Sequence, residues 1–130
     1  VVSEYAFAQK IAYAKVQNLQ GEFIKPTSAS ISAAASGEIP ADTRCSITNS
    51  DAVGAYPIST FTWMIIYKEQ NYSDRSREQA IATLDLLKYI LSDEAQGITS
   101  EVHYAPLPQK TREQSMKNLH TVTYDGMTIL

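Results

Sequence analysis

The regular spacing of apolar residues in the C-terminal half predicts a helix. Four of them recur at i, i+4, i+7 and i+11: Ala80, Leu84, Leu87 and Leu91. This spacing places them on one face of a helix. Just before them, Ser76 and Gln79 have the spacing of a capping box, in which each side chain bonds a free backbone N–H group at the helix start. We expect this helix to pack its apolar face on a sheet.

A second pattern, over residues 61–67, alternates as a β-strand does. Phe61 and Trp63 alternate with threonines, and the later positions are apolar on both faces. A strand that is apolar on both faces lies in the middle of a covered sheet. Pro57 has no N–H group to donate to a strand ladder, so we expect it to mark the start of this strand or a crossing between two subdomains.

The N-terminal part predicts shorter elements. Residues 1–5 are typical of a buried strand, although residues 6–14 could carry the chain on as a helix. Residues 13–17 and 22–26 are expected to pair as a hairpin around the turn at residues 18–21. Beyond the hairpin, Thr27 or Ser28 can cap a short helix over residues 29–36, and Gly37 can end it in the left-handed conformation. Residues 38–54 are rich in turn-forming residues and predict a surface loop or an irregular strand.

The chain beyond the long helix is predicted to be mainly helical. Ser92 can cap a second short helix that ends near Gly97. A last helix is expected over residues 109–120, with Pro108 near its first turn. Asp125 and Gly126 predict a turn before a terminal strand over residues 127–130. Helices and strands are mixed along the chain, which places it in the α/β class.

Composition and charge favour a globular domain without attraction for polyanions. The chain has 130 residues, of which 44% are hydrophobic and 19% charged, so it is long enough to bury a core. Its 11 basic and 14 acidic residues give a net charge of −3 at pH 7. No summed positive field is therefore expected to attract nucleic acid or anionic lipid. We predict no nucleic-acid partner.

The sequence has neither a membrane-spanning run nor a leader pattern. Its longest nearly uninterrupted apolar run, residues 61–67, is far shorter than the roughly 20 residues that a spanning helix needs. Val1 leads directly into apolar residues, without an initiating Met or a basic region. We expect the chain to be either a mature product or a piece of a longer protein.

Side chains that carry most enzyme chemistry are few and scattered. Cys45 is the single cysteine and cannot form an intramolecular disulfide. His103 and His120 lie in different predicted elements and lack the spacing of a metal-binding pair. Asp93 and Glu94 are adjacent at a predicted helix start, where the helix dipole favours negative charge. No glycine-rich nucleotide motif and no serine-nucleophile motif occurs. We therefore predict no metal, no cofactor and no catalytic activity.

Tyr56, Ser59 and Thr60 are the candidate ligand-binding residues. They stand where the chain leaves the predicted loop and approaches the predicted strand, so an aromatic ring and two hydroxyls could line a cleft there. Simple packing at the strand end is the other explanation for Tyr56. Phe61 and Trp63 could line the same cleft, but a place in the strand core explains them better.

Several segments together resemble a known family. Residues 54–70 resemble the return strand of the phosphate-binding proteins that serve phosphate ABC transporters, with an aromatic-Pro-Ile-Ser/Thr stretch, an apolar strand and a Lys-acid-Gln end. Other matches follow in the family's order. Residues 2–8, 24–37 and 102–108 resemble its GYVEYAYA strand, its VSPT…NAAKG helix and its DYASLP turn. The resemblance covers nearly the whole chain through short, mostly structural motifs.

The resemblance implies a fold larger than this chain. Family members have a two-lobed periplasmic-binding-protein fold of type II, with a mixed sheet flanked by helices. Residues 1–55 would be the end of lobe two, and residues 56–130 would return across the hinge into lobe one. The strand over residues 61–67 would then find its neighbours in the missing N-terminal part of the same protein.

The resemblance also implies a function. The chain would be the C-terminal portion of an extracytoplasmic protein, periplasmic or on the cell surface, that binds inorganic phosphate and delivers it to the membrane permease of an ABC transporter. The family grips phosphate with helix N-termini, hydroxyls, an Arg and an Asp, and its R-x-x-x-S-G-T motif lies upstream of the region matched here. In this chain Ser36 and Gly37 are followed by Glu38, with no Arg four positions before Ser36. No phosphate ligand of the family is therefore carried onto this chain.

Two further expectations follow. The alternative function is a sensory or adhesive scaffold module of the same ancestry, outside transport and without a ligand site. An upstream reading frame with a signal peptide and the R-x-x-x-S-G-T loop would favour transport, whereas a native start at Val1 would favour the scaffold. In either case an isolated return segment exposes apolar faces that the rest of the protein would cover, so we expect a homodimer or a larger assembly.

Overall fold

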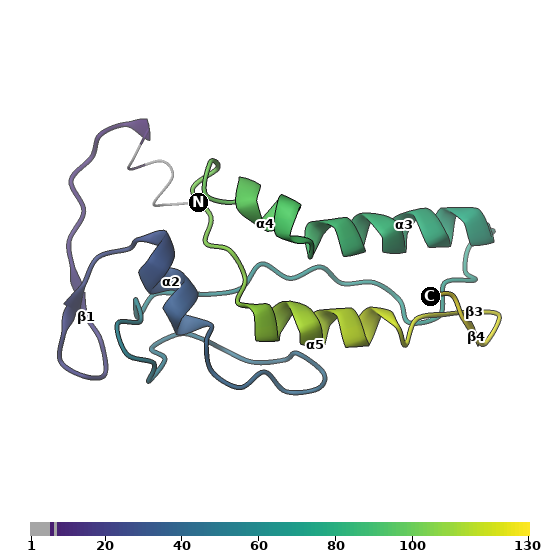
Figure 1. The fold of residues 1–130 in the computed structure, drawn as a ribbon, viewed down its shortest axis with the longest axis horizontal. Coiled ribbons are helices and arrows are strands. Elements are labelled where there is room, and N and C mark those ends of the chain that lie inside the picture. Colours follow the sequence, from purple (N-terminus) through teal and green to yellow (C-terminus); the bar gives the residue numbers. More distant parts are fainter. Residues whose placement is uncertain (1–5, 7) are drawn as a thin grey trace.

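The structure is a computed structural model that describes Ala6 and residues 8–130. The predicted strand over residues 1–5 lies outside the described residues. The described elements follow in chain order (Figure 1): β1 (Val16–Gln17), β2 (Phe23–Ile24), α2 (Ser28–Ala34), α3 (Arg77–Ile90), α4 (Asp93–Ile98), α5 (Gln109–Leu119), β3 (Thr123–Tyr124) and β4 (Met127–Thr128). Of the alternative helix over residues 6–14, Ala6 and Ala8 are helical, whereas residues 11–14 are not.

The predicted N-terminal hairpin is confirmed, with shorter strands. β1 and β2 pair antiparallel through Val16 opposite Ile24 and Gln17 opposite Phe23. Asn18 organises the turn, because its side-chain oxygen accepts the N–H groups of Gln20 and Glu22 at 3.1 and 2.9 Å. Gly21 takes a φ of +80°, a conformation that favours glycine.

Helix α2 confirms the predicted cap but not the predicted end. Thr27 is the N-cap and forms a capping box with Ser30. The helix ends at Ala34, and Gly37 does not take the left-handed conformation predicted for it. The reason is local: the N–H groups of Ala35 and Ser36 donate to carbonyls three residues back, so the last turn closes without a left-handed residue.

The three C-terminal helices begin close to the predicted positions. Ser76 and Gln79 form the predicted capping box of α3, and Ser92 caps α4 through the N–H of Ala95. Pro108 is the N-cap of α5, which ends at Leu119, one residue before the predicted end. These boundaries follow from hydrogen bonds within one helical turn, which the sequence specifies directly.

The terminal strand is confirmed as half of a small hairpin. β3 and β4 pair antiparallel, with Thr123 opposite Thr128 and Tyr124 opposite Met127. Asp125 and Gly126 both take positive φ, +52° and +73°, which is the conformation of a two-residue type I′ turn. The pairing partner of the terminal strand, β3, was not predicted.

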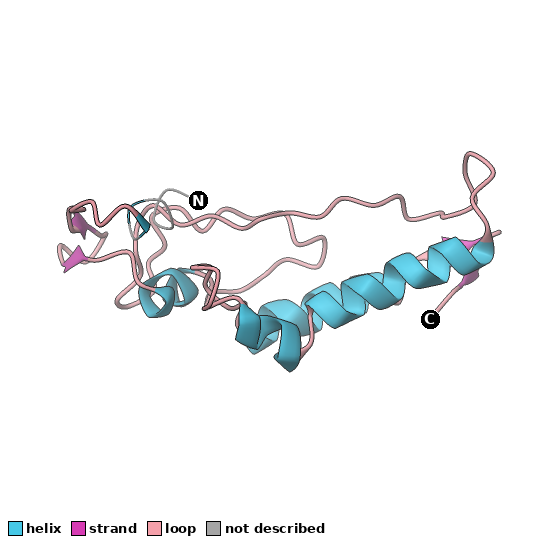
Figure 2. Ribbon diagram, turned by 90° about the horizontal axis from the view of Figure 1, so that it is seen from above, coloured by secondary structure: helices cyan, strands magenta, loops and turns pink. Residues whose placement is uncertain are grey.

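The central strand predicted over residues 61–67 is wrong as a paired strand. Figure 2 shows this stretch as a long extended trace beside the helices, and no residue of it pairs with another strand. Only Glu69, beyond its end, makes an isolated parallel bridge to Thr123. A strand that is apolar on both faces needs a neighbour at each edge, and the described residues supply one only at this far end.

The fold combines helices with small sheets, as the α/β class predicts, but the predicted mixed sheet is not assembled from the described residues. They form two separate two-stranded antiparallel sheets, one near each end of the molecule (Figure 1). The prediction that α3 packs on a sheet is therefore wrong. Its buried face, with Leu84, instead packs against Leu119 of α5 and Val122.

The core consists of two separate clusters. The N-terminal cluster contains Ala34, Ala35, Ile47 and Ala55, with Ala52 and Phe61 packed against it. The C-terminal cluster contains Leu84, Leu119 and Val122, with six partly buried side chains around it: Ile66, Leu87, Leu91, Met116, Ile129 and Leu130. The chain passes from one cluster to the other within residues 61–66.

Candidate functional site

The segment around Pro57 is fixed between α2 and the preceding loop. The N–H of Tyr56 donates to the carbonyl of Ser30 in α2 at 2.9 Å. The N–H of Asn49 donates to the carbonyl of Pro57 at 2.7 Å, and the Thr48 hydroxyl donates to the carbonyl of Ser59 at 3.2 Å. These bonds tie residues 56–59, which precede the extended stretch over residues 61–67, to α2 and to the loop before them.

The three predicted ligand-binding residues have different environments. Ser59 is buried, and its hydroxyl donates to the carbonyl of Tyr56 at 2.7 Å. Tyr56 is half-buried, and Thr60 is exposed with its hydroxyl 3.3 Å from the carbonyl of Phe61. The structure therefore brings Tyr56 and Ser59 together and leaves Thr60 facing solvent. Of the two hydroxyls, that of Thr60 is the accessible one.

A shallow depression of about 430 Å³ lies elsewhere, between the N-terminal hairpin and α2. Its lining includes two lysines, apolar side chains and the turn at residues 53 and 54: Lys15, Phe23, Ile24, Lys25, Thr27, Ala29, Ser30, Ala33, Val53 and Gly54. None of the predicted ligand-binding residues is among them. Both lysines are exposed, and the Thr27 hydroxyl is already bonded to Ser30. The depression is broad and open, and it does not enclose a small ligand.

The carboxylate of Glu69, which the sequence analysis did not single out, accepts four hydrogen bonds. It accepts the N–H groups of Asn71, Asp125 and Gly126 at 2.9, 3.0 and 3.1 Å, and the Thr123 hydroxyl at 2.8 Å. The N–H groups of Asn71 and Gly126 and the Thr123 hydroxyl lower the pKa of Glu69 from 4.5 to about 2.

This carboxylate serves the structure of the chain itself. Its four donors come from the residues that follow it and from the β3–β4 hairpin, so it holds that hairpin against the end of the extended segment. Both oxygens are already occupied by these bonds. The sequence predicts the Asp125-Gly126 turn, but a turn motif does not show that the N–H groups of these two residues donate to the carboxylate of Glu69.

The groups that could support catalysis or metal binding stay dispersed. In the described part of the chain, no three His, Cys, Asp or Glu side chains lie close enough together to hold a metal ion. Cys45 is half-buried, with its thiol 3.7 Å from the carbonyl of Thr43. The His120 ring nitrogen Nδ1 lies 2.8 Å from the carbonyl of Met116, at the end of α5. Each of these groups has a local structural contact.

None of the helices in the described part of the chain combines the length and the apolar character that crossing a bilayer requires.

Comparisons with known proteins give one consistent result. No family model matches the chain. It is 32% identical over 113 residues to the phosphate-binding protein PstS of Xylella fastidiosa (strain Temecula1), a match that covers 85% of this chain and 30% of the relative. It is 32% identical over 119 residues to the phosphate-binding protein PstS of Methanocaldococcus jannaschii, covering 81% of this chain and 29% of that relative. The chain thus spans about 30% of the length of these curated relatives.

Proposed function

We infer, from the premise that this chain is a homologue of the phosphate-binding proteins PstS, that it forms the C-terminal portion of a protein that binds inorganic phosphate. The observation that carries the proposal is the match over more than four-fifths of the chain to relatives with this name. We assign the chain no catalytic activity, in keeping with relatives that are named as binding proteins.

The proposed function belongs to a protein longer than this stretch, because the matched relatives are about three times its length. In our proposal the protein has two lobes, works outside the cytoplasm, in the periplasm or on the cell surface, and delivers phosphate to the membrane permease of an ABC transporter. The N-terminal part of the same protein is then a partner of this chain. It would supply the phosphate ligands and the neighbours of residues 61–67.

We propose that residues 1–55 end the second lobe and that residues 56–130 return to the first. Two separate buried clusters support this division, since the buried members of one lie within residues 34–55 and those of the other within residues 84–122. Among the described residues, three hydrogen bonds join the two parts at the crossing itself, through Tyr56, Pro57 and Ser59. Away from the crossing, the Ser32 hydroxyl donates to the carbonyl of Pro106, and the Gln114 amide donates to the carbonyl of Ala41.

Tyr56, Ser59 and Thr60 are proposed to line the hinge side of the ligand cleft. Ser59 and Tyr56 would act by fixing the crossing segment, because the Ser59 hydroxyl is already bonded to the carbonyl of Tyr56. Thr60 is the one of the three whose exposed hydroxyl could face a ligand.

A chimeric protein tests the function. The matched region of the Xylella fastidiosa relative is replaced by these 130 residues, and the product is titrated with phosphate in a calorimeter, with sulfate as the competing anion. We expect saturable binding that is selective for phosphate. The 130-residue chain alone should give no saturable heat, because the phosphate motif of the family lies outside it.

Cooperative thermal unfolding of the chimera serves as the folding control. A chimera that unfolds cooperatively but binds no phosphate would contradict the proposal and favour the scaffold alternative. Saturable phosphate binding by the isolated chain would instead show a ligand site within these residues. In the chimera, Thr60→Val should weaken phosphate binding if Thr60 lines the cleft, and the exposed Thr121 supplies the matched control, Thr121→Val.

A further inference from the structure

Most backbone N–H and C=O groups of residues 61–67, the extended segment, make no hydrogen bond to the described residues. No N–H group of residues 58–69 donates a hydrogen bond to any described residue. Among its carbonyls, that of Phe61 accepts the Thr60 hydroxyl and that of Tyr67 accepts the Gln70 amide, and both acceptors are local. An extended stretch with free donors and acceptors is a template for another strand.

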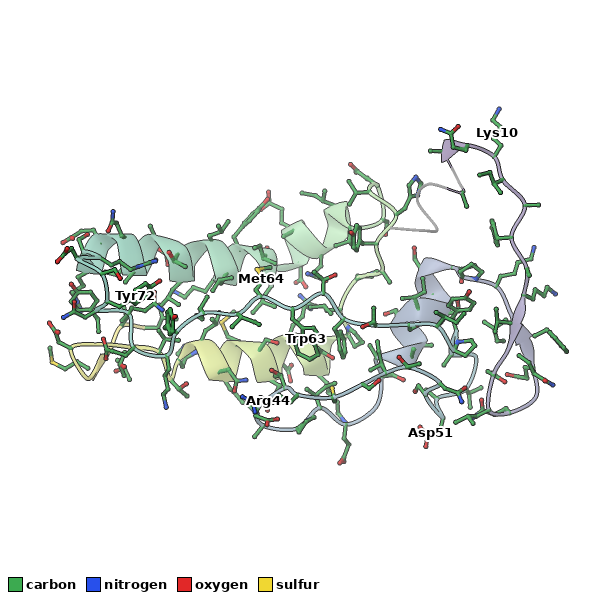
Figure 3. The ribbon with its side chains drawn as sticks, turned by 180° about the vertical axis from the view of Figure 1, so that it is seen from behind. Lys10, Arg44, Asp51, Trp63, Met64 and Tyr72 are labelled. Atoms are coloured by element: carbon green, nitrogen blue, oxygen red, sulfur yellow. The ribbon has the colours of Figure 1, made fainter. Side chains whose placement is uncertain are left out.

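The side chains of this segment are also uncovered. Trp63 and Met64 project to opposite sides of the extended segment in Figure 3, and both are exposed. Ile65 is 93% exposed and Tyr67 is exposed as well. Of this segment, Ile66 packs against the C-terminal cluster and Phe61 against the N-terminal one. The two ends are thus held, and the exposed middle presents apolar surface together with free backbone groups.

The composition of the segment favours pairing with an identical copy. Residues 61–67 carry no charge, no Pro and no Gly, and they are aromatic, β-branched or Met. In an antiparallel pair with Met64 on the two-fold axis, Phe61 lies opposite Tyr67 and Trp63 opposite Ile65. Such aromatic–aromatic and aromatic–β-branched pairs are favourable across strands, and no like charges face each other.

We propose that this chain, when separate from the rest of its protein, forms a two-fold symmetric dimer in which residues 61–67 of two copies pair as antiparallel β-strands around Met64. The occupant of the free edge is thus a second copy of the chain. The proposal shares with the proposed function the premise that this chain is part of a longer protein, but it involves no phosphate, so phosphate titration of the chimera and association of the isolated chain can fail separately.

Sedimentation velocity across the micromolar range tests the association. The parent chain should shift from monomer to dimer as concentration rises, and Ile65→Pro should abolish the shift. Proline removes one N–H from the segment, and that N–H donates to no other described residue. Val53→Pro is the matched control. Val53 is also exposed and β-branched, and it lies second in the Ala52–Ala55 turn, a position that favours proline.

Disulfide cross-linking tests the register, with Cys45→Ser as the background. Met64→Cys should cross-link on mild oxidation, because directly opposed residues of an antiparallel pair lie about 4.5–5.5 Å apart at Cα, within disulfide range. Thr62→Cys should not cross-link, because in this register position 62 of one copy and position 62 of the other lie four residues apart along the strands, about 13 Å.

Three results would overturn the proposal. A monomer at all concentrations would exclude the dimer. Association that Ile65→Pro leaves unchanged, or that Val53→Pro weakens equally, would assign it to another surface. Cross-linking that is as efficient through position 62 as through position 64 would contradict the register, and this readout does not depend on the proline variant.

Discussion

The Glu69 side chain holds the C-terminal hairpin against a part of the chain that is distant from it in sequence. Its carboxylate bonds donors that lie 54 to 57 positions away as well as the nearby Asn71. Hydrogen bonds to the ionised form stabilise the charge and lower the pKa. Folding therefore gains stability from this carboxylate only while it is ionised.

The sign of the pH dependence follows from the direction of the shift. The pKa of Glu69 falls from 4.5 to about 2 because of the N–H groups of Asn71 and Gly126 and the Thr123 hydroxyl. The contribution is fully present above pH 4.5 and is lost as the pH falls toward 2. We expect the melting temperature to fall through this window, and Glu69→Gln to remove part of that fall.

Thermal unfolding followed by circular dichroism at a series of pH values makes this measurement. Glu69→Gln should also lower the melting temperature at pH 7, because the amide lacks the negative charge and cannot accept through both of its terminal atoms. Glu38→Gln is the control, since no hydrogen bond joins the Glu38 side chain to the rest of the described chain. Equal pH profiles for the parent and Glu69→Gln would refute the assigned role.

At the scale of elements, the caps predicted from sequence specify where helices begin. The Ser76 hydroxyl accepts the N–H of Gln79 at 3.3 Å, and the Gln79 side chain accepts the N–H of Ser76 at 2.9 Å. Ser76→Ala removes half of this reciprocal pair and should cost about 0.5–2 kcal/mol of stability. Urea unfolding measures the loss. Arg77→Ala, one residue further on, should have little effect because the exposed Arg77 side chain takes no part in the cap.

Substitutions at two leucines of α3, one buried and one exposed, can test how this helix packs in the C-terminal cluster. Leu84 is completely buried, whereas Leu86 on the same helix is 58% exposed. Leu84→Ala should cost about 2–5 kcal/mol, because it removes buried methyl groups and leaves a cavity. Leu86→Ala should change the free energy of unfolding by less than about 0.5 kcal/mol. Similar losses for the two variants in urea unfolding would contradict the packing of α3 against α5.

At the scale of the whole molecule, two clusters replace one core. Figure 1 shows β1 and α2 toward one end and α3, α5 and the β3–β4 hairpin toward the other. The N-terminal cluster and the C-terminal cluster share no member. Of the extended segment between them, Phe61 and Ile66 pack against the two clusters. Its other apolar side chains are exposed: Trp63, Met64, Ile65 and Tyr67.

Hydrogen exchange can show whether the two parts open separately. Leu84→Ala should reduce the protection of amides in α3 and α5 and leave those of α2 unchanged, because α2 packs in the other cluster. A loss of protection in α2 as large as that in α3 would show that the chain unfolds as one cooperative unit. The exchange of α2 in Leu86→Ala provides the reference.

The sequence by itself determined the elements that depend on neighbours within a few residues. Thr27, Ser76 and Ser92 mark helix starts because a cap bonds N–H groups two or three positions away. Asn18 and Gly126 mark hairpin turns through equally local bonds and conformations. The family resemblance likewise came from short local motifs, and the matched relatives support it.

Only the tertiary structure decided which distant groups meet. An alternating pattern over residues 61–67 indicates a strand, but whether that strand is paired depends on partners far away in the sequence, and the described residues provide none along its length. The candidate residues Tyr56, Ser59 and Thr60 are neighbours in sequence, yet burial and a hydrogen bond set Ser59 apart from Thr60. The bonds of Glu69 to the C-terminal hairpin span more than fifty residues, a distance over which no local pattern carries information.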